Sequence, residues 1–136
     1  MAKDDMQTTK WSTLKGKKED FEKELKKRIE KGRKLLKIPV EVVGRKPGLR
    51  QGTYEVYNEE EERKFLLEYE KWKQFNIELL KRSFNIDNNE YLQEYIKGES
   101  PTIMSEKVKE RKNDIERQIA ILESLIERLP LIPETN

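Results

Sequence analysis

Residues 59–84 read EEEERKFLLEYEKWKQFNIELLKRSF and carry the strongest helical pattern of the chain. Its apolar side chains recur every three or four residues, which is typical of an amphipathic α-helix. They form two adjacent stripes: Phe65, Tyr69, Trp72, Phe75 and Leu79 in the first, and Leu66, Ile77, Leu80 and Phe84 in the second. Together the stripes cover an arc of about 200° at 100° per residue. We therefore predict a central helix that touches more than one neighbour.

The residues before this stripe favour a helix start. Asn58 is a good N-cap, and Glu61 stands three residues later, where a capping-box partner is expected. The acidic run at residues 59–62 suits the positive end of a helix dipole. We interpret these glutamates as helix-start electrostatics rather than as a metal or catalytic carboxylate site.

A second long helix is predicted upstream, from residue 12 or 17 to residue 37. Its stripe consists of Leu14, Phe21, Leu25, Ile29 and Leu36. Gly32 falls on the same stripe, where the lack of a side chain would let a neighbouring helix approach closely. Pro39 then ends the helix.

Residues 40–57 connect the two helices. Both ends of this connector have strand composition, and Lys46-Pro47-Gly48 has turn chemistry. The pattern predicts either a minor β-hairpin or an extended strap, since an isolated hairpin is marginal in water. The segment does not match a GxxxxGK[ST] phosphate loop.

Downstream, a short helix is predicted over residues 89–97 and a long one from residue 101 or 105 to residue 129. The long helix carries a heptad seam that either closes the bundle or builds a homodimer. Its candidate helix-association face comprises Ile119, Ile121, Leu122, Leu125, Ile126 and Leu129. The prediction is thus an all-α bundle of three long helices and one short helix. Residues 1–12 form a flexible N-terminus and residues 13–136 a single helical domain.

The composition excludes several kinds of chemistry. The chain contains no Cys and no His, which removes disulfides, thiol nucleophiles, Cys/His zinc sites and histidine bases. No apolar run approaches the roughly 18 residues that span a bilayer, and no signal peptide is visible. We expect a cytoplasmic protein that is not an enzyme, with no catalytic residue, cofactor, metal site or membrane association.

Charge is unevenly distributed along the chain. Residues 1–50 carry 16 Lys or Arg and 8 Asp or Glu, a net charge of +8, whereas residues 51–136 carry 13 and 19, a net charge of −6. This asymmetry either is neutralised inside the molecule or marks a surface for an anionic partner. The candidate anion or nucleic-acid patch comprises Lys26, Lys27, Lys31, Arg33, Lys34, Lys37, Arg45, Lys46 and Arg50.

The order of motifs over residues 29–133 resembles a known arrangement. It runs from a Leu-Leu-x-Ile-Pro helix end through the connector to Tyr69, Trp72 and the Leu79-Leu80 pair, and ends with Leu129-Pro130. This order is similar to the N-terminal helical adaptor region of bacterial stress and phage-defence effector proteins. The chain departs from them because no effector domain follows in its 136 residues. The resemblance implies an adaptor, oligomerisation or regulatory role linked to bacterial defence, phage or mobile-element biology.

Two functional hypotheses follow. The first is a non-enzymatic protein-interaction module with a protein partner. The alternative is a nucleic-acid-associated protein that binds the phosphate backbone through the first long helix and residues 44–52. None of the familiar DNA-binding motifs is visible in the sequence.

Overall fold

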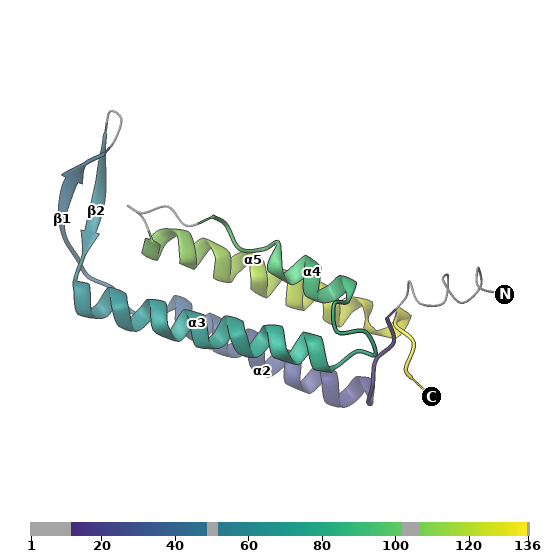
Figure 1. Ribbon diagram of the computed structural model, residues 1–136. Coiled ribbons are helices and arrows are strands. Elements are labelled where there is room, and N and C mark those ends of the chain that lie inside the picture. Colours follow the sequence, from purple (N-terminus) through teal and green to yellow (C-terminus); the bar gives the residue numbers. More distant parts are fainter. Residues whose placement is uncertain (1–11, 49–51, 102–106, 136) are drawn as a thin grey trace.

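The computed structural model of the protein describes residues 12–48, 52–101 and 107–135. It consists of α2 (Lys18–Leu36), β1 (Val42–Pro47), β2 (Thr53–Tyr57), α3 (Glu59–Arg82), α4 (Glu90–Ile96), α5 (Lys107–Arg128) and a short 3₁₀ helix, η1 (Leu129–Leu131). The prediction of a mostly helical bundle with three long helices and one short helix is confirmed (Figure 1). The connector is the hairpin rather than a strap. Within the described ranges no helix is long and apolar enough to cross a bilayer.

The core lies where α3 packs on α2, α4 and α5. The predicted centrality of α3 is therefore confirmed, and α5 shares it because α5 also packs on the other three helices. Phe65, Tyr69, Trp72 and Leu80 of α3 are each at most 3% exposed. The hairpin, in contrast, projects from one end of the bundle (Figure 1).

One core position of α3 differs from the prediction. The apolar pattern places Phe75 in the first stripe, but its side chain is 50% exposed, whereas the neighbouring Asn76 is completely buried. The buried line runs through residues 65, 69, 72, 76 and 80, and residue 75 lies about 100° around the helix from residue 76. An amide can occupy this core position because its hydrogen-bonding groups have partners there, as described below.

Half of the predicted capping box at α3 is present. Asn58 is the N-cap, and its Oδ1 accepts a hydrogen bond from Glu61 N at 3.0 Å. The reciprocal bond is absent: Glu61 Oε1 accepts from Glu41 N at 2.8 Å, and Asn58 N donates to Glu41 O at 2.8 Å. The start of α3 therefore fixes the base of the hairpin instead of closing its own capping box.

The segment before α2 is not helical. The apolar spacing places Leu14 in the helix stripe, but Leu14 precedes the helix and is buried between two other segments. Leu14 N donates to Pro133 O at 2.9 Å, and Leu14 also forms a β-bridge with Phe84. Ser12, predicted to belong to the flexible N-terminus, is only 2% exposed and its hydroxyl donates to Glu90. The rest of that N-terminus, residues 1–11, lies outside the described residues.

The candidate association face of α5 is used inside the chain. Ile119, Leu122, Leu125 and Leu129 are each at most 6% exposed, and Ile121 and Ile126 pack against the same core while half-buried. The seam therefore closes the bundle, which leaves little apolar surface on it for a second copy. Of the two predicted starts of this helix, Pro101 is not helical and residue 105 lies outside the described residues.

Candidate anion-binding surface

The predicted basic patch divides between two places. Its members on α2 (Lys26, Lys27, Lys31, Arg33 and Lys34) and Lys37, which is the C-cap of α2, are all exposed. Arg45 and Lys46 are exposed on β1, in the hairpin that projects away from the bundle (Figure 1). Arg50 lies outside the described residues. The structure therefore brings the α2 cations together but separates them from those of the connector.

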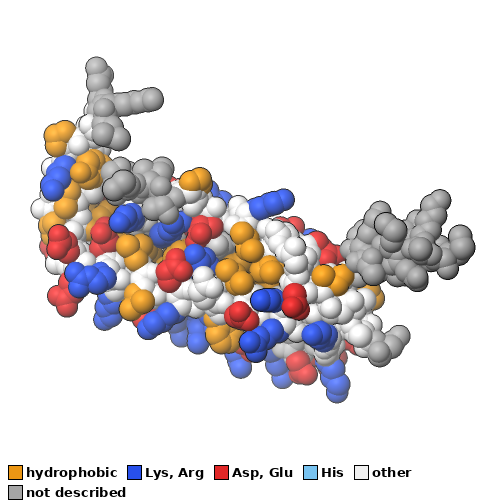
Figure 2. All heavy atoms as spheres, in the orientation of Figure 1, with side chains coloured by type: hydrophobic (Ala, Val, Ile, Leu, Met, Phe, Trp, Pro, Cys, Tyr) orange, Lys and Arg blue, Asp and Glu red, His pale blue; other side chains and the backbone are white. Residues whose placement is uncertain are grey.

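Only two of the α2 cations form ion pairs with described residues. Lys26 pairs with Glu22 at 2.8 Å along the helix, and Arg33 pairs with Glu123 of α5 at 2.7 Å. No described carboxylate lies within ion-pair distance of the remaining four, which are Lys27, Lys31, Lys34 and Lys37. In Figure 2, Lys and Arg side chains gather along the lower edge, where α2 runs. Internal neutralisation therefore leaves this side of α2 positive.

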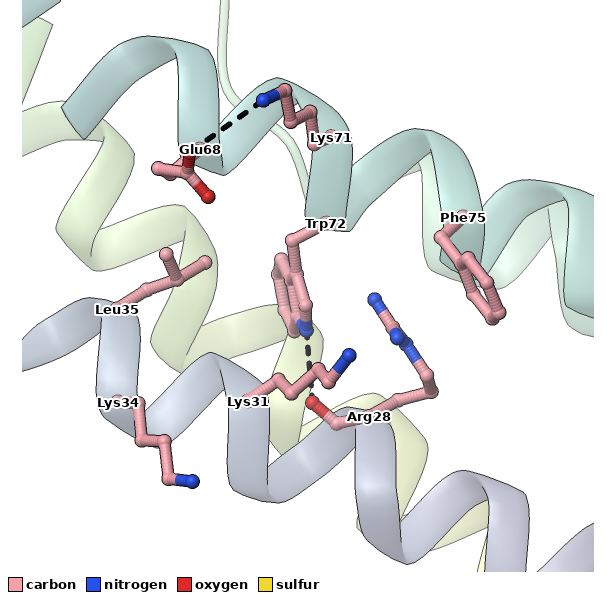
Figure 3. Close-up of a pocket in the computed structure, with 8 residues that line it drawn as sticks. All are labelled: Arg28, Lys31, Lys34, Leu35, Glu68, Lys71, Trp72 and Phe75. Carbon is pink, nitrogen blue, oxygen red and sulfur yellow. Dashed lines mark hydrogen bonds and ion pairs between the residues drawn. The ribbon is translucent and has the colours of Figure 1, made fainter. Parts of the chain in front are cut away.

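A hollow of about 390 Å³ lies between α2 and α3 beside these lysines. Figure 3 shows Leu35 and the indole of Trp72 on its inner side and Phe75 at one end. Lys31 extends across the gap below Trp72, whereas Lys34 points away from α3 (Figure 3). Lys71 and Glu68 form a 3.7 Å ion pair at the α3 rim. The lining thus combines one carboxylate and two aromatic rings with four cations, which are Lys31, Lys34, Lys71 and Arg28.

Arg28 was not among the predicted site residues. It is only 4% exposed, yet it lines the hollow, and its guanidinium carbon lies 4.0 Å from the centre of the Phe75 ring. Its Nε donates to Asn76 Oδ1 at 2.7 Å, and its backbone carbonyl accepts from Trp72 Nε1 at 2.8 Å. Burial lowers the pKa of Arg28, and the nearby Glu24 and Tyr95 partly offset this effect.

A buried polar chain continues from Arg28 through the core. Asn76 Nδ2 donates to Tyr95 OH at 2.7 Å, and Tyr95 OH donates to Gln118 Oε1 at 3.3 Å. These side chains come from α2, α3, α4 and α5, so the network joins all four helices. Burial raises the pKa of Tyr95, which stays a neutral hydrogen-bond donor. Polar residues at stripe positions of the sequence, Arg28 and Asn76, were the signal that could have revealed it.

A second polar cluster ties the segment between α4 and α5 to the bundle. Asp114, fully buried, accepts hydrogen bonds from Ser100 N at 3.0 Å and from Arg111 at 2.6 Å, and also from Arg117. Burial would raise its pKa, but these hydrogen bonds outweigh burial and lower it.

Glu99 extends this cluster to α3. It accepts hydrogen bonds from Tyr69 OH and, at 3.0 Å, from Lys73. Burial would raise the pKa of Glu99, but the same two hydrogen bonds lower it. Both carboxylates are thus occupied by partners of the same chain, which is typical of a structural role. In the parts of the chain that the structure describes, no group of three or more His, Cys, Asp or Glu residues is placed to hold a metal ion.

Comparisons of this chain with protein-family models, with curated proteins and with solved structures return no match.

Proposed function

We propose that this chain is a non-enzymatic protein-interaction module whose α2 binds an acidic surface of a partner protein. The observation that carries the proposal is a row of four lysines along α2 and at its C-cap, Lys27, Lys31, Lys34 and Lys37, for which the described residues supply no ion-pair partner. Uncompensated charge of one sign attracts and orients a partner of the opposite sign.

The surroundings of the lysine row favour a protein over a nucleic acid. Exposed Glu30 lies within the row, and Glu68 lines the hollow beside it, so a continuous phosphate backbone would meet like charges. Phe75 and Leu67 on α3 are 50% and 54% exposed. Aromatic and apolar side chains rimmed by cations are typical of protein interfaces. The resemblance to adaptor regions of bacterial defence proteins agrees with this role.

The test compares binding of two polyanions. Wild-type protein is titrated with a fluorescent ten-residue poly-glutamate peptide and with a 20-nucleotide single-stranded DNA, each at about 50 mM and 200 mM salt. The variant reverses three charges (K27E, K34E and K37E), and the control reverses three exposed lysines outside α2 (K81E, K97E and K109E).

The proposal expects peptide binding that the variant loses and the control retains. Tighter binding of the DNA, with the same loss in the variant, would replace it with the phosphate-backbone alternative. Equal losses of peptide affinity in the variant and the control would show that the lysine row has no special role, and would overturn the proposed function.

A further inference from the structure

From the geometry of the hollow between α2 and α3 we infer that Arg28 and Lys31 form a receptor for a single side-chain carboxylate of the acidic partner. This inference rests on the proposed function, because it names the group of the partner that the module recognises. It adds a specific site, centred on a residue outside the exposed lysine row.

The first argument is the unused hydrogen-bonding capacity of Arg28. A guanidinium carries five N–H donors, and among the described residues only Nε of Arg28 has an acceptor, Asn76 Oδ1. No described carboxylate forms an ion pair with this side chain, although it is only 4% exposed. Burying this charge is costly and the nearby Glu24 offsets the cost only in part, so an anion that reaches its Nη groups would be bound favourably.

The second argument is orientation. The Arg28 guanidinium is held in place by the 2.7 Å bond from Nε and by the Phe75 ring 4.0 Å away. In Figure 3 it points into the space between Trp72 and Phe75, and Lys31 lines the same hollow. A donor group fixed before the ligand arrives loses little conformational entropy on binding. The two cations therefore line one hollow, and the Arg28 guanidinium is held in place there.

The third argument concerns the kind of anion. The space is bounded by two aromatic rings and by Leu35, and a planar carboxylate matches the fork of a guanidinium. Glu68 on the rim and Glu24 near Arg28 limit the positive charge that a doubly charged phosphate would need. The methylenes of a glutamate side chain would lie against the rings of Trp72 and Phe75, between which the Arg28 guanidinium points (Figure 3). A glutamate of a partner protein thus fits the site better than a phosphate.

The experiment follows the side-chain N–H signals of Arg28 and Trp72 by ¹⁵N NMR. The full chain is titrated with the poly-glutamate peptide, with sodium acetate and with sodium phosphate. The expected result is a saturable shift of the Arg28 Nε–H signal, with the peptide bound most tightly. K31A should weaken peptide affinity by about tenfold, as expected for loss of one charge-assisted hydrogen bond. K23A removes the same charge from the same helix and should leave affinity within about twofold.

Three outcomes would overturn the inference, each in a recognisable way. Peptide binding with an unchanged Arg28 signal would show that Arg28 is not the receptor, and the proposed function as an interaction module would be unaffected. Phosphate that saturates the Arg28 signal at lower concentration than acetate would exclude the carboxylate assignment. Equal effects of K31A and K23A would show that binding depends on overall charge alone. Acetate that shifts the Arg28 signal when the peptide does not bind would support the receptor and overturn the proposed function instead.

A second variant protects this test against a folding defect. Arg28 takes part in the core network, so its replacement would perturb the bundle as well as the hollow. F75A removes a half-exposed ring from the rim, together with its contact to the Arg28 guanidinium, and leaves the bond from Arg28 Nε to Asn76 in place. It should reduce peptide affinity while leaving the far-ultraviolet circular dichroism spectrum unchanged.

Discussion

Trp72 on α3 and Gly32 on α2 are in direct contact across the interface between the two helices. A Cβ atom on Gly32 would lie 2.6 Å from Trp72 Cζ2 and 3.0 Å from Ile119 on α5. The same indole donates its N–H to the backbone carbonyl of Arg28 at 2.8 Å. The position of Trp72 therefore sets the spacing of α2 and α3, and with it the width of the hollow.

This contact predicts the effect of Gly32→Ala. Alanine favours a helix over glycine by about 1 kcal/mol, but the added methyl group overlaps a buried ring that has no room to move. We expect a net loss of about 1–3 kcal/mol in the free energy of unfolding, measured by urea denaturation. Gly44→Ala is the control, because a Cβ at Gly44 would meet nothing within 4 Å. A Gly32 variant as stable as the control would contradict the close approach of the helices.

The buried network predicts that Asn76→Ala is strongly destabilising. The change removes the acceptor for Arg28 Nε and the donor to Tyr95 OH, and leaves two buried polar groups without these partners. We expect a loss of about 2–4 kcal/mol in the free energy of unfolding. Gln74→Ala, an exposed change two residues earlier, should stay within about 0.5 kcal/mol of wild type. Similar values for both variants would show that the network does not stabilise the bundle.

The second polar cluster predicts acid sensitivity. The pKa values of Asp114 and Glu99 are lowered in the folded protein from ordinary values of 3.8 and 4.5. Each carboxylate therefore contributes stability above its unfolded pKa, and this stability is lost as the pH falls through the lower folded pKa. The urea midpoint of the wild type should fall steeply below about pH 4.

Asp114→Asn tests this assignment. The variant should be less stable than wild type at pH 7, and its midpoint should fall less between pH 5 and pH 3. Glu116→Gln, at an exposed position on the same helix, should retain the wild-type slope. Parallel pH profiles for wild type and Asp114→Asn would show that this carboxylate does not cause the acid sensitivity.

The hairpin is predicted to be dispensable for the bundle. Val42 and Val43 are 42% and 56% exposed, and all of β1 is exposed. Replacing residues 43–56 by a short Gly-Ser linker keeps Val40 and Tyr57, which pack against the core. We expect the helical circular dichroism signal and cooperative urea unfolding to be retained. Loss of cooperative unfolding would show that the hairpin helps to hold the helices together.

Much of the fold follows from local sequence patterns. The buried residues Phe65, Tyr69 and Trp72 recur at helical spacing, and Asn58 is the N-cap that its side chain predicts. These features depend on the chain within a few residues, where periodicity and capping chemistry act. The close approach at Gly32 was predictable in the same way, because a glycine on an apolar stripe leaves room for the side chains of a neighbouring helix.

The candidate site was only partly predictable, because it depends on contacts between residues that are far apart in the sequence. Exposed lysines of α2 are visible in the sequence as charge, but the role of Arg28 depends on Asn76 and Phe75, which lie 48 and 47 residues away along the chain. A buried polar residue is acceptable only where distant residues supply its hydrogen bonds. Asn76 rather than Phe75 occupies the core for the same reason, because the hydrogen-bond partners of Asn76 lie on other helices.

A helical bundle with a basic α2 follows from the residue pattern alone, since periodicity, helix ends and charge are local properties. Which cations remain without ion pairs depends on the packing of the helices, because ion pairs such as Arg33 with Glu123 join different helices. The burial of the α5 seam within the chain and the position of Arg28 beside a hollow depend on the same packing. These features depend on how the helices pack on one another, and the residue pattern of a single helix does not specify that packing.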